Sequence, residues 1–149
     1  MAFHFTLEAL LRLRSTQTRQ EEVRLESLSQ KILLARQERD ELKEQQRAYE
    51  LALVNDLRYG AEASELHLRL VGQRGLREIE HRLEQVILDL RQAWQEQEKR
   101  YLAARQREEV LQSLRERHEA TYREEERRRE QQLVDDLFLS RHKHSARQN

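Results

Sequence analysis

One narrow stripe of positions, spaced alternately four and three residues apart, runs through the first third of this chain. Most of these positions carry apolar side chains and a few carry polar ones. A strict seven-residue repeat keeps one face turned towards a partner helix, which is typical of a left-handed coiled coil rather than of a globular core. We call this stripe the seam, and its positions are Leu7, Leu11, Arg14, Thr18, Glu21, Leu25, Leu28, Ile32, Ala35, Arg39, Leu42, Gln46, Tyr49 and Leu53.

The composition suits a chain that buries a stripe rather than a three-dimensional core. Its 149 residues include no proline, no cysteine and three glycines, with 38% charged and 37% hydrophobic residues. Disorder is the main alternative for so polar a chain. However, the 28 basic and 28 acidic residues cancel, and glutamate, glutamine, arginine, leucine and alanine are strong helix formers. We therefore predict a helical protein.

Nothing in the sequence indicates secretion or a membrane span. Without cysteine there are no disulfides and no thiolate metal ligands. No apolar run approaches the ~20 residues needed to cross a bilayer, and no signal peptide is recognisable among the first residues. The expectation is a soluble, intracellular protein.

All three glycines fall between residues 60 and 75, and this window is predicted to break the helix. Tyr59-Gly60 supplies a stop signal, and Ser64 is a suitable N-cap for a second helix. We predict a single domain over residues 1–149, an all-α, long antiparallel two-helix coiled-coil hairpin with an overhanging second helix. The expected bounds are about 5–58 for the first helix, 59–64 for the turn, 65–138 for the second helix and 140–149 for a polar tail.

The second helix has a stripe of its own. Between Val86 and Trp94 two four-residue steps follow one another, which predicts a stutter that locally unwinds the supercoil. With a turn near residue 61, residues whose numbers sum to about 122 should face each other, as Leu28 and Trp94 would. The stripe consists of Leu76, Ile79, Leu83, Val86, Leu90, Trp94, Gln97, Tyr101, Ala104, Glu108 and Leu111.

This register leaves the end of the second helix without a partner, because the first helix cannot reach residues beyond about 118. The overhang, from about Tyr122 to Leu139, would extend roughly 25–30 Å at 1.5 Å per residue. Pairs such as Glu124 with Arg128 favour a helix there, but each contributes only ~0.2–0.5 kcal/mol. The overhang is therefore expected to be a marginal helix until a partner docks on it.

Both ends of the chain carry apolar residues where a free coiled coil should be polar. One interpretation is a terminal plug, in which the two sets pack together and close the open end of the hairpin. The other is a docking surface for a further protein, because exposed apolar patches usually mark interaction sites. The two sets are Phe3, Phe5, Leu10 and Leu13 near the start, and Leu133, Val134, Leu137, Phe138 and Leu139 near the finish.

These segments resemble a known family, the flagellar FliJ proteins. The stretch from Phe3 to Arg14, which reads FHFTLEALLRLR, is similar to the Phe-x-Leu and Leu-Leu-x-Leu-Arg opening of that family. Residues 111–117 and 130–136 are similar to its later segments, and the break near Gly60 matches its hairpin. The resemblance covers nearly the whole chain.

The resemblance implies a non-enzymatic component of the flagellar type III export apparatus. FliJ proteins look like the central stalk of rotary ATPases, an antiparallel coiled coil whose terminal end enters a ring, here the hexameric export ATPase FliI. They are also linked to the cytoplasmic domain of the export gate protein FlhA and to export chaperones. The implied location is cytoplasmic, peripheral on the cytoplasmic face of the inner membrane through this apparatus.

Two sets of residues are candidate binding sites on this interpretation. The overhang joins aliphatic and basic side chains that could enter a ring, and the ridge after the turn lies where the family contacts the gate. Gly72 and Gly75 in this ridge segment should each weaken the helix by ~1 kcal/mol relative to alanine. The gate-binding set is Leu76, Ile79 and Leu83. The ring-binding set is Phe5, Leu10, Arg127, Arg128, Arg129, Leu133, Val134 and Leu137.

No catalytic, metal-binding or nucleic-acid-binding motif stands out. The chain lacks a Gly-Lys-Ser phosphate loop, so ATP hydrolysis would belong to a partner, and no cofactor or small-molecule substrate is expected. We interpret His142 and His144 as part of the solvated tail. Gly72 to Gly75 has the GXXG spacing of an RNA-binding KH domain, but that fold needs strands and a basic face. Interleaved charges with zero net charge likewise do not favour nucleic acid.

Two non-enzymatic alternatives fit the same patterns. One is the equivalent stalk of a virulence type III secretion system, which would share the architecture and differ in its client. The other is a self-associating coiled-coil scaffold, because polar seam positions such as Arg14, Glu21 and Arg39 make any single pairing weak.

Overall fold

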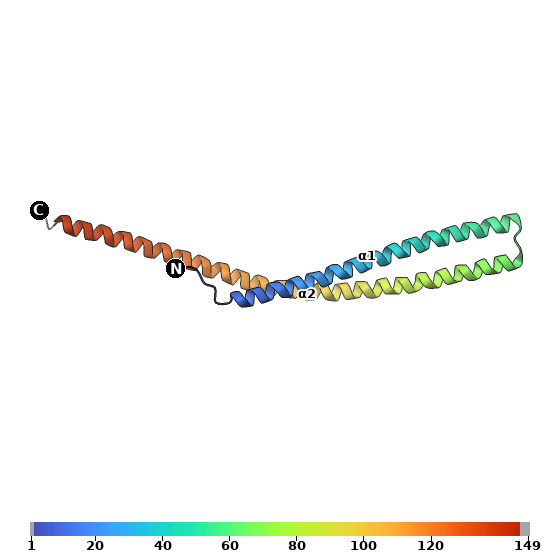
Figure 1. Ribbon diagram of the computed structural model, residues 1–149, viewed down its shortest axis with the longest axis horizontal. Coiled ribbons are helices and arrows are strands. Elements are labelled where there is room, and N and C mark those ends of the chain that lie inside the picture. The colour runs from blue at the N-terminus through green and yellow to red at the C-terminus, as the bar shows by residue number, and fades with distance from the viewer. Residues whose placement is uncertain (1, 147–149) are drawn as a thin grey trace. The chain divides into compact units, whose positions relative to one another are not determined.

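The computed structural model describes residues 2–146, and the side chains of residues 144–146 lie outside the described part. Two α-helices account for most of it, α1 (Glu8–Tyr59) and α2 (Ala63–Ala146), and no strand occurs between residues 2 and 146. A short connection joins them, and the helices pack against each other as an antiparallel hairpin (Figure 1). The predicted all-α two-helix fold is confirmed.

Packing divides the chain into two compact units. One is residues 19–102, which contains the turn, and the other combines residues 1–18 with 103–149. Each unit contains part of both helices, so the seam is found in both.

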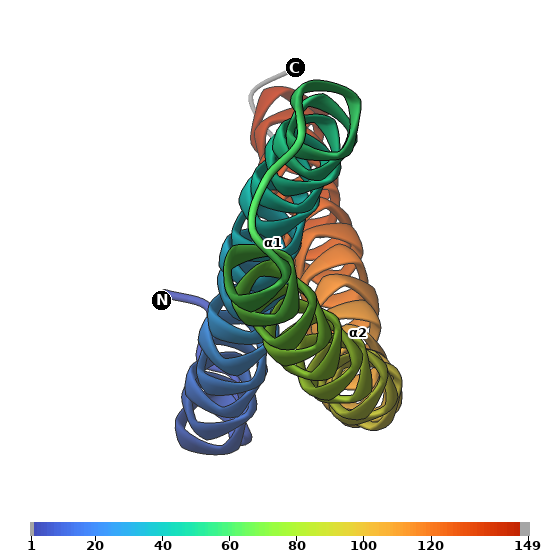
Figure 2. The ribbon, with the colours of Figure 1, turned by 90° about the vertical axis from the view of Figure 1, so that its right-hand side faces the viewer.

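The connection between the helices depends on Gly60. Its φ of 81° lies in the left-handed region, which glycine adopts without a steric penalty. The amides of Gly60 and Ala61 both donate to the carbonyl of Asp56 at 3.0 Å, and this ends α1 with a glycine cap. Figure 2 looks onto this turn end of the hairpin.

The second helix begins earlier than expected. The amides of Glu65 and Leu66 donate to the carbonyl of Glu62 at 3.1 Å, so Glu62 stands at the N-cap position. Ser64 was expected to be the N-cap, but it lies inside the first turn of α2. The glycine cap needs only residues 60–62 to reverse the chain, which leaves Ser64 free to enter the helix.

The two outer helix ends also differ from the expected bounds. The first helix starts at Glu8 rather than near residue 5, because a turn precedes it, in which the Phe5 carbonyl accepts the Glu8 amide at 3.1 Å. The second helix continues to Ala146 instead of ending near residue 138. No glycine or proline follows Gly75, so nothing stops the helix in the expected polar tail. Residues 147–149 of that tail lie outside the described residues.

The seam of α1 lies where the heptad pattern predicts. In the unit of residues 19–102, every α1 seam position is buried or half-buried, and Ala35 and Leu42 are the most buried. Cross-seam contacts have the predicted register: the Trp94 indole donates to the Ser29 hydroxyl at 2.8 Å, and Arg69 pairs with Asp56. These number pairs sum to 123 and 125, close to the predicted 122.

The seam of α2 is shifted by one residue at two places. Ile87 is 3% exposed and Val86 is 47% exposed, so Ile87 occupies the seam position that the sequence analysis gave to Val86. Glu80 is half-buried while Ile79 is 51% exposed. The corrected positions, 76, 80, 83, 87, 90, 94 and 97, alternate steps of four and three without interruption. The predicted stutter between Val86 and Trp94 is therefore wrong.

Gly72 allows a close contact across the seam near the turn. A Cβ atom at Gly72 would lie 2.6 Å from the Tyr49 Oη and 3.1 Å from its Cζ, so the Tyr49 ring packs directly on the glycine. At Gly75, in the next helical turn, a Cβ atom would meet nothing within 4 Å. Both glycines lie inside a continuous α2.

We expect alanine to be tolerated better at Gly75 than at Gly72. Gly75→Ala should stabilise the hairpin by about 1 kcal/mol through helix propensity alone. Gly72→Ala gains the same propensity but must displace the Tyr49 ring, so it should be less stable than Gly75→Ala by about 1–3 kcal/mol. Denaturant unfolding followed by circular dichroism measures both. Equal stabilities would mean that Tyr49 rotates away at no cost.

Candidate interaction surfaces

The N-terminal residues pack on α2 in the unit formed by residues 1–18 and 103–149. The Phe5 ring contacts the His118 ring with centroids 5.8 Å apart, and the Phe3 ring contacts the Tyr122 ring at 5.7 Å. Phe5 is 4% exposed, so this predicted ring-binding residue is a buried core residue of the free chain. The predicted ring-binding residue Leu10 lies at the surface, 37% exposed.

Tyr122 marks the point where α2 loses its partner. Its hydroxyl donates to the Glu126 carboxylate at 2.5 Å, one turn further along. This hydrogen bond, helped by local desolvation and by the negative charge of Glu126, raises the pKa of Tyr122 above its ordinary value. After Tyr122, every described side chain up to residue 143 is exposed except that of Glu126. The overhang therefore begins at residue 123.

The overhang presents apolar side chains to solvent. Leu133 and Leu137 are four residues apart, as are Val134 and Phe138, so each pair shares a helix face. Because these side chains remain 56–64% exposed, they do not pack with the N-terminal phenylalanines, and the terminal plug, one of the two interpretations of these residues, is not formed. The exposed set is Leu133, Val134, Leu137, Phe138 and Leu139.

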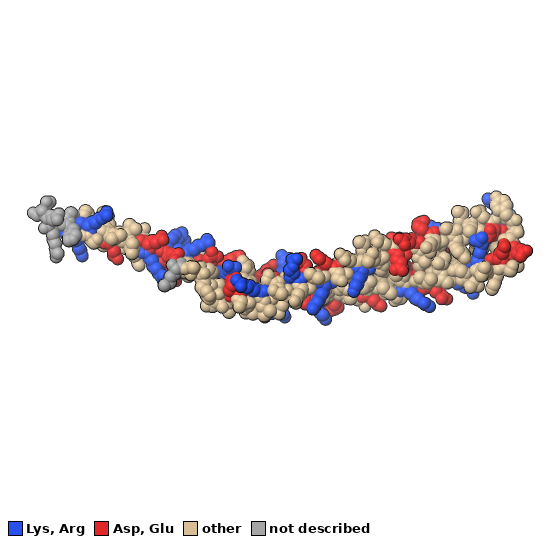
Figure 3. All heavy atoms as spheres, in the orientation of Figure 1, with Lys and Arg blue, Asp and Glu red and all other residues tan. Residues whose placement is uncertain are grey.

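The three predicted ring-binding arginines precede this apolar set. Arg127 and Arg128 both pair with Glu124, at 2.7 and 3.3 Å, and Arg129 lies 3.9 Å from Glu125. Such exposed pairs within one helix are worth little stability, so the guanidinium groups can exchange partners cheaply. Figure 3 shows basic and acidic atoms interleaved on the visible face of this segment.

The predicted gate-binding ridge is divided between the seam and the surface. Leu76 and Leu83 are half-buried seam residues, and of the three only Ile79 is exposed. Ile79 belongs instead to an exposed apolar set, of which Ile79 and Val86 were expected in the seam and Leu68 was not singled out. Each of its members directly precedes a seam position: Leu68 precedes Arg69, Ile79 precedes Glu80 and Val86 precedes Ile87. This spacing is the sequence signal that could have identified them.

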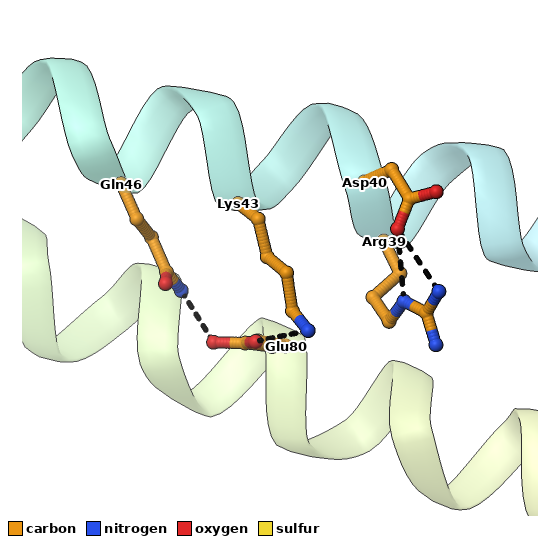
Figure 4. A network of polar contacts seen from close by, with 5 residues as sticks. All are labelled: Arg39, Asp40, Lys43, Gln46 and Glu80. Carbon is orange, nitrogen blue, oxygen red and sulfur yellow. Dashed lines mark hydrogen bonds and ion pairs between the residues drawn. The ribbon is translucent and has the colours of Figure 1, made fainter.

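Polar side chains cross the seam at several levels. Glu80 accepts a hydrogen bond from the Gln46 amide at 2.8 Å and lies 3.8 Å from the Lys43 ammonium group (Figure 4). Gln97 is buried, and its amide nitrogen donates to the Glu21 carbonyl at 3.1 Å and also to the Glu21 carboxylate. Buried polar pairs of this kind fix the register of a coiled coil at some cost in stability.

The described part of the chain holds neither a candidate membrane span nor a candidate metal site. None of the helices, within the described residues, has a stretch apolar and long enough to cross a bilayer. Over the same part of the chain, no three histidine, aspartate or glutamate side chains come together as a metal site would require. His142 packs on the Phe138 ring with centroids 5.1 Å apart, and the side chain of His144 lies outside the described part.

Comparison with known proteins identifies a family. The sequence model of a family described as the flagellar FliJ protein matches residues 3–147, which is nearly the whole chain. No curated protein and no solved structure matches the chain.

Proposed function

Because the chain belongs to the FliJ family of flagellar export-apparatus coiled-coil proteins, we propose that it is the stalk that engages the hexameric export ATPase FliI. The observation that carries this proposal is the overhang of α2, where five large apolar side chains are exposed and no other segment of the described chain covers them. A single helix is also the narrowest part of a hairpin, which suits entry into the pore of a ring.

The chemistry of the overhang suits a contact that binds and releases. Burying the three aliphatic residues Leu133, Val134 and Leu137 would contribute ~1.5–3 kcal/mol each, before the cost of ordering an unsupported helix is subtracted. Arg127, Arg128 and Arg129 are held only by exposed pairs within the helix, so they can turn to carboxylates of a ring at little cost.

In this proposal the buried Phe5 has a supporting role. It holds the N-terminal segment on α2 at His118, and Leu10 is the N-terminal member of the ring-binding set that remains exposed. The chain contributes binding and no chemistry, so ATP hydrolysis is carried out by FliI. The rate of ATP hydrolysis by FliI, with and without the intact chain, tests the proposal.

We further propose a second contact, with the cytoplasmic domain of FlhA, and an association with export chaperones. We place the FlhA contact on the surface around Ile79, where Leu68 and Val86 are exposed on the same flank of the seam. A chain bound to FliI at one end and to FlhA near the turn would be peripheral on the cytoplasmic face of the inner membrane. Leu76 and Leu83 would support this surface from the seam.

Ile79→Asp is expected to abolish binding to the FlhA cytoplasmic domain without changing the helical content. The side chain is half exposed in the free protein, so aspartate is tolerated there but would be desolvated without a partner in a complex. Leu34→Asp, at a similarly exposed leucine of α1, is the matched control and should bind normally. Titration calorimetry measures both. Unaltered binding by Ile79→Asp would show that Ile79 takes no part in the FlhA contact.

A further inference from the structure

A hollow of about 360 Å³ opens between the two helices in the unit of residues 19–102. Its lining residues differ from those of the overhang and of the surface around Ile79, and its volume is within the range of small ligand-binding clefts. We call it the Trp94 groove. Its lining residues are Ser29, Ile32 and Arg36 from α1, and Arg91, Trp94 and Gln95 from α2.

Trp94 is the only tryptophan of the chain and is held in place at the groove. It occupies a seam position and is half-buried, and its indole N–H donates to the Ser29 hydroxyl at 2.8 Å. The polar edge of the indole is therefore satisfied within the protein. A fixed, partly exposed tryptophan beside an aliphatic residue, here Ile32, is the kind of anchor that dominates protein interfaces.

The two arginines of the groove lack acidic partners. Within the described residues, neither Arg36 nor Arg91 takes part in an ion pair or a side-chain hydrogen bond. Asp40 is four residues after Arg36, but its carboxylate is engaged by both Nε and Nη2 of Arg39, at 3.1 and 2.9 Å (Figure 4). Most arginines of the overhang, by contrast, are paired with a carboxylate one turn away. Two positive charges in this groove are thus available to an external anion.

A smaller hollow of about 200 Å³ continues the groove towards the turn and shares Arg91 with it. Ile87 and the exposed Leu88 extend the apolar lining, and Glu84 is the one acidic residue there. The combined surface therefore has an apolar floor with arginines on both helices. This arrangement differs from a nucleic-acid site, because Glu84 interrupts the basic residues and the chain has no net charge.

We propose that the Trp94 groove binds an acidic peptide segment of a partner protein. A bulky apolar side chain of the segment packs beside Trp94 and Ile32, and flanking carboxylates pair with Arg36 and Arg91. Guanidinium groups bind carboxylates through two parallel hydrogen bonds. Such a pair fixes the orientation of the carboxylate in addition to attracting its charge. This site is independent of the proposed contacts with FliI and FlhA.

A displayed library of random peptides, selected on the intact protein, tests the proposal. Enriched peptides should carry net negative charge and at least one large apolar residue, and when synthesised they should change the fluorescence of Trp94 on titration. The variant Arg36→Glu/Arg91→Glu should weaken their binding by at least about tenfold, because it replaces two attractions by two repulsions. Peptides with lysine in place of their carboxylates should bind this variant better than the unaltered protein.

Matched variants separate the groove from general electrostatics and from misfolding. Arg82→Glu/Arg100→Glu changes two exposed arginines of α2 outside the groove and should leave peptide binding intact. Arg36→Gln/Arg91→Gln removes both charges but keeps unbranched polar side chains, and it should weaken binding while circular dichroism stays unchanged.

Three outcomes would overturn the proposal. The first is enrichment of neutral or basic peptides, and the second is equal weakening by the control pair of arginines. The third is another occupant of the groove: a single-stranded oligonucleotide that displaces the peptides, or a second copy, shown by Trp94 fluorescence that depends on protein concentration alone.

Discussion

A chain truncated after Arg123 should no longer stimulate ATP hydrolysis by FliI, although its hairpin should remain folded. The removed part holds the exposed apolar set and the arginines at 127–129, which are the residues proposed to enter the ring. Loss of three aliphatic contacts worth ~1.5–3 kcal/mol each would weaken binding far more than tenfold. The rings and ion pair that hold the N-terminal segment, Phe3 with Tyr122 and Glu8 with Arg115, are retained.

Point variants show whether the stimulation of FliI depends on the apolar side chains of the overhang or only on the length of its helix. Leu133→Ser/Leu137→Ser, in the full chain, should lose most of the stimulation. Leu33→Ser/Leu34→Ser changes two leucines of similar exposure on α1 and should keep it. Steady-state ATP hydrolysis by purified FliI, with circular dichroism of each variant, supplies the comparison. Full stimulation by the truncated chain would show that this end of the protein is not a stalk.

Ile87→Ala should destabilise the hairpin by about 2–4 kcal/mol, whereas Val86→Ala should cost less than about 1 kcal/mol. Ile87 is almost completely buried between the helices, so its truncation leaves a cavity, but nearly half of Val86 is already in water. The two residues are adjacent in one helix and differ by a single methylene group, which makes each the control for the other. Urea unfolding followed by circular dichroism gives both free energies.

This comparison decides between the two possible seams of α2. A seam through Val86, with the stutter that it requires, predicts the larger loss for Val86→Ala. A seam through Ile87 keeps the steps of four and three from Leu76 to Gln97 and predicts the larger loss for Ile87→Ala. Equal effects would mean that the helix rotates between the two arrangements.

The seam of α1 was predictable because its repeat continues over many heptads and because charged neighbours isolate some of its apolar positions. Leu42 stands between Glu41 and Lys43, so only one rotation of the helix buries the leucine without burying a charge. In α2, Val86, Ile87 and Leu88 are consecutive, and the repeat alone cannot choose between positions about 100° apart around the helix. Packing against α1 determines that Ile87 is the buried residue. The same packing places Glu80 in the seam beside Gln46.

The candidate sites were predictable to different degrees. The exposure of the overhang followed from counting residues on either side of the turn, because α2 is longer than α1. The burial of Phe5 against His118 was not anticipated, although the pair fits the hairpin register, because Phe5 lies in the non-helical segment before α1. The Trp94 groove was not anticipated either, because its arginines come from different helices and the pattern of one helix does not show them together.

The sequence by itself determined that this protein is two helices joined at Gly60, since helix propensity, the heptad repeat and the glycine cap are local properties of neighbouring residues. It also determined the register to within a few residues, because a short turn fixes which positions can meet. Only the tertiary structure decided which side of α2 faces α1, that Tyr49 packs on Gly72, and which arginines remain without carboxylates. These outcomes depend on contacts between residues far apart in the chain. In α2, two adjacent apolar side chains could each pack against α1, and only the contact between the helices determines which one does.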